Sequence, residues 1–265
     1  MNEAVKVRTD ARGVARITLN RPENHNAFND TLLHELAGAF RSRDEARDVR
    51  IIVLTGTGKS FCSGGDLAWM RAIKDKSRSE RIVGSAAVAE VFRVADTVTK
   101  PVIVRVNGPA YGGGVGLVSV ADSAIAVDSA RFALSEVRLG LVPANISPYV
   151  VRRIGTANAR RYGLSGRTFS AEEARRIGLV HEVVSEDDLD AAVEREIAAF
   201  LEAPPEAIKI TKALIAYVSA HSNDENIRYT TERLADAWET ECGREGIRCF
   251  LEKTIPSWRA RSEKS

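Results

Sequence analysis

The chain has 265 residues, of which 44% are hydrophobic and 28% are charged, and a chain of this length and composition can bury a hydrophobic core without disulfide bonds. Its 38 basic and 36 acidic residues leave a formal net charge of +2, which gives nucleic-acid binding no electrostatic support. The sequence has no apolar run of the roughly 18 residues that a membrane-spanning helix needs, and the charged N-terminus does not resemble a signal peptide. We therefore expect a cytoplasmic protein that binds neither membranes nor nucleic acid.

The cysteines and histidines do not form a recognisable metal-binding pattern. The three cysteines, Cys62, Cys242 and Cys249, are odd in number, and the four histidines are scattered along the chain. Neither set has the spacing of a zinc site or of a disulfide framework. We expect structural cysteines, a reducing compartment and no bound metal.

The first two-thirds of the chain alternates between strand and helix patterns. Segments rich in Val and Ile predict strands, and residues 31–47 and 79–96 have the apolar spacing of amphipathic helices. The predicted strands are residues 15–19, 49–54, 102–106 and 123–127. This alternation is typical of an α/β fold.

After residue 187 the strand patterns end and only helical patterns follow. The predicted helices cover residues 188–202, 204–219, 224–239 and 243–253. Their apolar faces are larger than an isolated tail could bury, so we expect them to pack on the core or on another subunit. We therefore divide the chain into a core of residues 1–200 and a helical region of residues 201–265.

Two glycine-rich segments superficially resemble nucleotide-binding loops. Residues 53–60 end in Gly-Lys-Ser, but a phosphate-binding loop needs a glycine where this chain has Val53. Residues 112–116 lack the third glycine of the dinucleotide fingerprint, because Leu117 stands there. Neither segment therefore predicts nucleotide binding.

Both glycine-rich segments follow a predicted strand and lead into a helix. Backbone N–H groups at a helix start carry the positive end of the helix dipole, and glycine lets a ligand oxygen approach them. Two such turns side by side would form an oxyanion hole. The alternative is that these glycines only permit tight turns.

Five ordered blocks of the sequence resemble the enoyl-CoA hydratase/isomerase, or crotonase, superfamily. Residues 56–67 (GTGKSFCSGGDL) and 106–117 (VNGPAYGGGVGL) are similar to its two signature segments, and three more blocks fit in the same order: residues 20–27, 132–143 and 245–253. The resemblance implies a spiral of ββα turns with a helical C-terminal trimerisation region. It also implies a homotrimer or a pair of trimers, and an acyl-CoA thioester as substrate, with no separate cofactor.

The resemblance assigns roles to individual residues. Ser63 and Gly113 match the two amides of the oxyanion hole, and Glu136 matches a catalytic glutamate. The acyl-CoA site is implied to include Ala27, Ser63, Gly64, Gly65, Asp66, Leu67 and Gly113, together with Phe250 and Lys253, which match positions that reach CoA from a neighbouring subunit.

The sequence departs from the family pattern at two acidic positions. Hydratases of the family typically carry a second glutamate, but Gly116 stands at that position. Isomerases commonly carry an acid where this chain has Ala144. Glu136 is then the one acid that the resemblance places in the pocket, and its apolar neighbours would raise its pKa.

An intact oxyanion hole with one glutamate favours an enoyl-CoA hydratase, a lyase that adds water to an α,β-unsaturated acyl-CoA. The sequences of residues 112–117 and 139–151 resemble those of a bacterial branch of hydratases that is assigned to methylglutaconyl-CoA in leucine breakdown. Within the superfamily, isomerase, decarboxylase and thioester hydrolase remain alternatives. A second class of alternative is a protein that binds acyl-CoA without turning it over.

Overall fold

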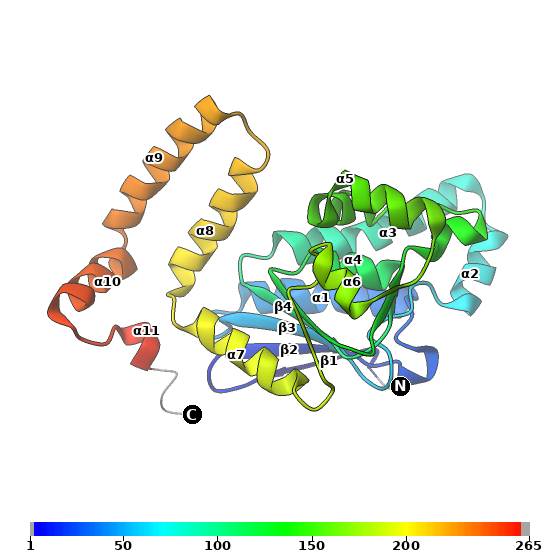
Figure 1. The fold of residues 1–265 in the computed structure, drawn as a ribbon, viewed down its shortest axis with the longest axis horizontal. Coiled ribbons are helices and arrows are strands. Elements are labelled where there is room, and N and C mark those ends of the chain that lie inside the picture. The colour runs from blue at the N-terminus through cyan, green and yellow to red at the C-terminus, as the bar shows by residue number, and fades with distance from the viewer. Residues whose placement is uncertain (1–2, 261–265) are drawn as a thin grey trace.

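The computed structural model describes residues 3–260 and has a six-stranded sheet at its centre (Figure 1). All neighbouring strands are parallel except the first pair, which is antiparallel. In spatial order the strands are β1 (Val5–Thr9), β2 (Val14–Leu19), β3 (Ile51–Gly56), β4 (Val102–Val106), β6 (Ser123–Val127) and β9 (Glu182–Val184). The four predicted strands are confirmed as the inner four, and β1 and β9 are edges that the sequence patterns did not indicate.

Helices from the first two-thirds of the chain, and one from the part that follows, pack on this sheet. Helix α1 (Asp30–Glu45) contacts β1 and β2 and packs against α3 (Arg78–Thr97), while α7 (Leu189–Leu201) contacts β4 and β6. Asn29 starts α1 by accepting a hydrogen bond from the amide of Leu32. The predicted α/β class is confirmed.

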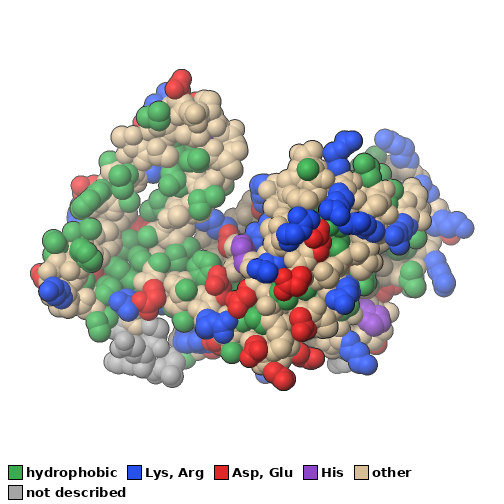
Figure 2. Space-filling view, viewed as in Figure 1, with side chains coloured by type: hydrophobic (Ala, Val, Ile, Leu, Met, Phe, Trp, Pro, Cys, Tyr) green, Lys and Arg blue, Asp and Glu red, His purple; other side chains and the backbone are tan. Residues whose placement is uncertain are grey.

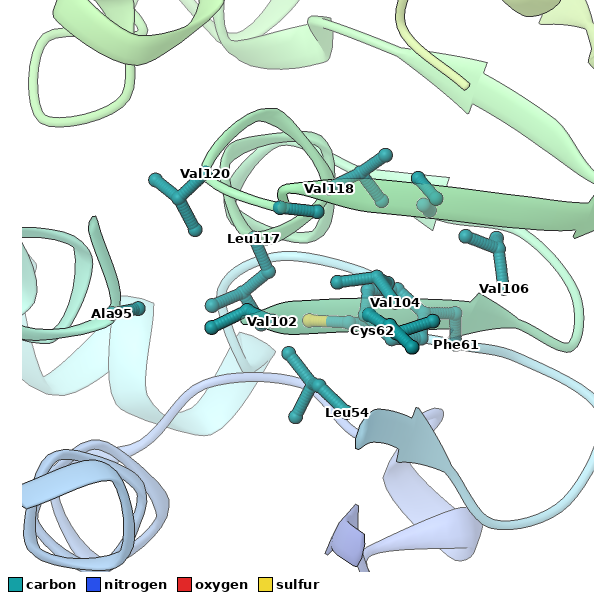
Figure 3. Close-up of a cluster of buried hydrophobic side chains, with 14 of the residues drawn as sticks. Leu54, Phe61, Cys62, Ala95, Val102, Val104, Val106, Leu117, Val118 and Val120 are labelled. Carbon is teal, nitrogen blue, oxygen red and sulfur yellow. The ribbon is translucent and has the colours of Figure 1, made fainter. Parts of the chain in front are cut away.

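The hydrophobic core lies directly behind the two glycine-rich segments. Every residue of β3 is buried, and Figure 3 shows Leu54 from β3, Val102 from β4 and Leu117 from the helix after the second segment pointing toward one another. Phe61 and Cys62, which lie within residues 56–67, belong to the same cluster and are fully buried. Both segments are therefore anchored in a packed interior.

A smaller three-stranded sheet, in the order β5 (Ala110–Tyr111), β7 (Arg131–Ala133) and β8 (Phe169–Ser170), lies beside the main sheet. Strand β5 leads into α4 (Gly113–Ser119), and β7 leads into the 3₁₀ helix η2 (Ser135–Leu139). Because β5 and β7 are parallel neighbours, the second glycine-rich turn and the segment that carries Glu136 leave the sheet side by side. Helices α5 (Ser147–Ser165) and α6 (Ala171–Arg176) complete this part of the molecule.

The C-terminal helices form an arm that extends away from the sheet (Figure 1). They are α8 (Pro205–Val218), α9 (Asn223–Glu239), α10 (Glu241–Glu252) and α11 (Ser257–Ala260), and all lie within the predicted helical region. Apolar side chains gather on this arm (Figure 2), including the exposed residues Ile215, Ile227, Leu234, Trp238, Phe250 and Leu251. Of the helices that the structure describes, none has the length and apolar character to cross a membrane.

Candidate active site

The first glycine-rich turn connects β3 to helix α2 (Leu67–Lys74) and is fixed at its start by β5. The amide of Cys62 donates to the carbonyl oxygen of Pro109, and the amide of Tyr111 donates to the carbonyl oxygen of Cys62. These bonds form an isolated parallel bridge between the two segments. The turn that follows Cys62 therefore lies against the turn that follows Tyr111.

Ser63 does not present the free amide that we expected. Its N–H donates to the carbonyl oxygen of His25, with an N···O distance of 3.0 Å. A backbone amide that already has a carbonyl acceptor is not available to a substrate oxygen without breaking that bond. The structure therefore does not support Ser63 as an oxyanion donor.

Gly65, two residues further on, has an amide without an acceptor among the hydrogen bonds of residues 3–260. Phe28 forms a parallel bridge with Gly65, in which the amide of Phe28 donates to Gly64 and the amide of Asp66 donates to Phe28. In such a bridge the N–H of the central residue points away from its partner strand. Because Gly65 is exposed, this N–H is accessible to a ligand.

The second turn is built on Gly112, whose φ of 49° and ψ of −113° are readily adopted only by glycine. The amide of Gly112 donates to Ala133 of β7, and Gly113 begins helix α4. Within the described part of the chain, no hydrogen bond uses the amide of Gly113. A β carbon on Gly64 would lie 3.1 Å from the carbonyl oxygen of Tyr111, so the two turns are in contact.

Glu136 lies at the second turn, as the resemblance implied. Its Oε1 is 2.8 Å from the point that a β carbon on Gly112 would occupy. Its Oε2 is buried and has no hydrogen-bond partner within residues 3–260. Burial raises the pKa of the Glu136 carboxyl above its ordinary value, although its own backbone amide partly opposes the shift. A carboxyl group with a raised pKa and a free oxygen is suited to proton transfer.

At position 116, where hydratases of the family typically carry a second glutamate, the space for a side chain is filled by neighbouring residues. A β carbon on Gly116 would lie 2.4 Å from Cγ2 of Ile146 and 2.7 Å from Cε1 of Phe92. Both neighbours are buried. A glutamate at this position would therefore need the core behind α4 to be rearranged.

The loop before α1 is joined to the first turn by a largely buried ion pair. The guanidinium of Arg21 lies 2.9 Å from Oδ2 of Asp66 and also donates to the carbonyl oxygen of Ala27 at 2.7 Å. The other oxygen of Asp66 caps α2 by accepting from the amides of Ala68 and Trp69. Burial alone would raise the pKa of Asp66, but these hydrogen bonds and the Arg21 charge outweigh it and lower the pKa. The structure thus brings Ala27 and the 63–67 turn together.

Phe250 and Lys253 lie at the other end of the molecule, on and just after helix α10 in the C-terminal arm (Figure 1). The side chain of Phe250 is 81% exposed. The structure does not bring these two residues to the pocket of the same chain. Their predicted role, which places them against the site of a neighbouring subunit, stays a prediction.

Comparisons with known proteins identify the family of this chain. A sequence model of the family described as enoyl-CoA hydratase/isomerase matches residues 9–261. The chain belongs to this family. The crotonase superfamily that the sequence resembles is thereby confirmed, and the methylglutaconyl-CoA branch is not tested by this match.

Three proteins that are similar to this chain span nearly its full length. The mevalonyl-coenzyme A hydratase sidH of Aspergillus fumigatus is 31% identical over 92% of this chain and 90% of its own. An enoyl-CoA hydratase of Shewanella pealeana is 35% identical and superimposes with a TM-score of 0.92 over 96% of each chain. Pseudomonas aeruginosa AtuE is 33% identical, with a TM-score of 0.93 over 97% of this chain and all of that one. The crotonase fold is therefore confirmed.

The residues that the structure describes contain no group of three or more His, Cys, Asp or Glu side chains that could hold a metal ion. Among the described residues, the polar groups left without a partner at the two turns include the amides of Gly65 and Gly113 and one carboxyl oxygen of Glu136.

Proposed function

We propose that this protein is an enoyl-CoA hydratase, which adds water reversibly to the conjugated double bond of an acyl-CoA thioester. The observation that carries the proposal is the position of the Glu136 carboxyl, which lies on the α carbon of Gly112 with one oxygen unpaired. The next residue, Gly113, has a free amide at the start of a helix, and the amide of Gly65 is free on the adjoining turn. An acid is thus held beside two donors.

The two amides bind the thioester carbonyl oxygen. Negative charge develops on this oxygen when water adds to the β carbon and an enolate forms, and the donors stabilise it most at that stage. Gly113 adds the positive end of the α4 dipole. In comparable sites one such donor contributes about 3 kcal/mol to the stability of the transition state.

Glu136 transfers the proton in two steps. Its carboxylate accepts a proton from water as the water oxygen bonds to the β carbon of the substrate. The resulting carboxyl group then delivers that proton to the α carbon of the enolate, which restores the carboxylate. The product is a 3-hydroxyacyl-CoA, and atoms and charge balance without a second acid, provided that both steps occur on one face of the substrate.

The packing around Gly116 supports a mechanism with one acid. Ile146 and Phe92 occupy the space that a side chain at position 116 would need. A buried apolar wall also excludes water from that side of the pocket, which strengthens electrostatic interactions inside it. Double-bond isomerisation is less well supported, because Ala144 stands where isomerases of the family commonly carry an acid.

For the acyl group we propose methylglutaconyl-CoA or a related glutaconyl-CoA. The support is the resemblance of residues 112–117 and 139–151 to that branch. A relative named for mevalonyl-CoA is also consistent with a branched, oxygen-bearing acyl chain. On this proposal the enzyme would serve leucine degradation.

The arm α8–α11 is proposed to dock on further copies of the chain in a trimer or a pair of trimers. Its support is the set of exposed apolar side chains and a groove of about 420 Å³ that is lined mainly by apolar residues of α8, α9 and α10. A surface of this kind is typical of an association site. In such an assembly Phe250 and Lys253 would reach the CoA of a neighbour.

The proposal is tested by incubating the protein with crotonyl-CoA and, separately, with methylglutaconyl-CoA. Loss of the conjugated thioester absorbance together with a gain of one water mass is the expected result. An unchanged mass with a moved double bond would indicate an isomerase, loss of carbon dioxide a decarboxylase, and free CoA a hydrolase. Tight binding of both thioesters with neither a change in mass nor a moved double bond would contradict catalysis altogether.

A further inference from the structure

Phe28 lies between the two glycine-rich turns and contacts both. It occupies the loop between β2 and α1, two residues before α1 begins, and its side chain is only 3% exposed. Its backbone contacts the first turn, and its ring contacts the second.

The backbone of Phe28 holds the first turn. Its amide donates to the carbonyl oxygen of Gly64 with an N···O distance of 2.6 Å, and its carbonyl oxygen accepts from the amide of Asp66 at 2.9 Å. These two bonds flank Gly65 and direct its N–H away from Phe28. The orientation of the first donor is thereby fixed by main-chain atoms, which a change of side chain at position 28 leaves in place.

The ring of Phe28 holds the second turn. Its Cε2 and Cδ2 atoms lie 2.3 Å and 2.8 Å from the point that a β carbon on Gly113 would occupy, so the ring rests on the α carbon of that glycine. Any side chain at position 113 would collide with the ring. The start of α4, and with it the second donor, can therefore approach the first turn only as far as the ring allows.

A second ring supports Phe28 from behind. The ring centroids of Phe28 and Phe92 are 6.1 Å apart, with 52° between the planes, which is a favourable aromatic arrangement. Phe92 in turn contacts Gly116, one turn further along α4. Glycines at positions 113 and 116 share one face of the helix, so α4 rests on two rings that support each other.

We propose that Phe28 is a positioning residue that sets the separation between the amides of Gly65 and Gly113. It holds the first through its backbone and the second through its ring. The inference rests on the proposed function, because the separation matters only if both amides bind one oxygen. Donors must lie about 2.7–3.1 Å from that oxygen, and a displacement of about 1 Å can reduce the rate roughly 10²-fold.

The test compares Phe28→Ala and Phe28→Leu with a matched core variant, Phe40→Ala. Phe40 is also a fully buried phenylalanine, but it lies in the middle of α1. Two quantities are measured for each folded protein. One is kcat and KM for crotonyl-CoA. The other is the infrared frequency of the bound thioester carbonyl in butyryl-CoA labelled with ¹³C at that carbon, a saturated analogue that cannot be hydrated.

For Phe28→Ala we expect kcat to fall about 10²-fold, with KM within about threefold of wild type. The bound carbonyl should lose most of the shift to lower frequency that the wild-type protein induces. Phe28→Leu should be intermediate, because leucine still reaches the glycine but is narrower than a ring. Phe40→Ala should lose comparable thermal stability while keeping both kcat and the carbonyl shift.

The proposal is overturned if Phe28→Ala, or Phe28→Leu should the alanine variant not fold, keeps the wild-type carbonyl shift. It is also overturned if the rate loss is no greater than in Phe40→Ala. A failure of the proposed function is distinguishable, because wild-type protein itself would then fail to hydrate crotonyl-CoA, whether or not it shifted the carbonyl frequency of bound butyryl-CoA.

Discussion

The carboxyl group of Glu136 lies against the α carbon of Gly112, with Oε1 at 2.8 Å from the point where a β carbon would stand. Gly112 directly precedes Gly113, whose amide begins α4. The φ of 49° at Gly112 would be strained for any other amino acid. The first glycine of the run 112–114 therefore meets two physical requirements, its backbone conformation and the space for the acid. Burial disfavours the ionised form of this acid, so the stability of the protein should depend on its protonation.

Glu136 should make the protein less stable as the pH rises. Its pKa is raised by burial, so the folded state binds the proton more tightly than the unfolded state. The free energy of unfolding should therefore fall between the pH at which an ordinary glutamate titrates and the raised pKa of Glu136. Glu136→Gln should gain stability relative to wild type across this window. Urea denaturation at several pH values measures it, with exposed Glu186→Gln as the control. A difference from wild type that does not change with pH would contradict the prediction.

The choice of Gly65 rather than Ser63 as a donor is tested by a pair of substitutions. Proline at position 65 removes the N–H, whereas Gly65→Ala keeps it, and the nearest neighbour of its β carbon is the flexible Met70 side chain at 3.3 Å. We expect Gly65→Pro to lower kcat about 10²–10³-fold and Gly65→Ala to remain close to wild type. Steady-state kinetics with crotonyl-CoA measure both. Equal activity of the two variants, once folding is verified, would remove Gly65 from the hole.

Restoring the family's second glutamate should harm this protein. In Gly116→Glu the new β carbon collides with Ile146 and Phe92, and overpacking of this kind typically costs about 1–3 kcal/mol before the buried charge is counted. Adding Ile146→Ala should recover part of the stability, because it removes the nearer obstacle. Thermal denaturation of the single and double variants measures the effect. A single variant as stable as wild type would show that the pocket has room for two acids.

The ion pair between Arg21 and Asp66 should stabilise the site in neutral solution but not in acid. The side chains are 16% and 7% exposed, so Asp66→Asn leaves a mostly buried guanidinium without its counter-charge. We expect a loss of roughly 3 kcal/mol near pH 7. Because the pKa of Asp66 is lowered, its contribution is present above the ordinary aspartate pKa and lost as the pH falls through the lowered value. The variant should approach wild type in acid, as measured by urea denaturation. A constant difference at every pH would contradict this account.

The sequence predicted the interior of the fold better than its edges. Strands β3, β4 and β6 are buried almost throughout and consist mostly of apolar residues, and the pattern alone identifies them. Strand β1 has four exposed residues out of five, and β9 has only three residues, so neither has a clear pattern. Their place in the sheet depends on pairing with β2 and β6, which lies beyond local sequence.

The site was predictable in its parts but not in its hydrogen bonds. The blocks indicated two turns and a segment with Glu136 that the structure brings together. Which amide of the first turn stays free depends on two contacts with earlier residues. Gly65 pairs with Phe28, 37 residues earlier, and the carbonyl oxygen of His25 accepts a hydrogen bond from the amide of Ser63. One local signal pointed to Gly65, because a glycine lets a ligand oxygen approach its amide more closely than a serine does. The space beside Gly116 is filled by Phe92 of α3 and by Ile146. Both are distant from Gly116 in the sequence, so this packing too could not be predicted from local patterns.

The central claim is that Glu136 carries the proton in a hydration reaction, and hydration of crotonyl-CoA by wild type and Glu136→Gln in ¹⁸O-labelled water tests it most directly. We expect wild type to form a product that contains one labelled oxygen. Its rate should rise with pH through the raised pKa of Glu136. Glu136→Gln should bind the thioester with similar affinity, hydrate it about 10²–10⁴-fold more slowly and lose that pH dependence. Hydration slowed by less than tenfold, with the acid limb of the pH profile retained, would contradict the role of Glu136.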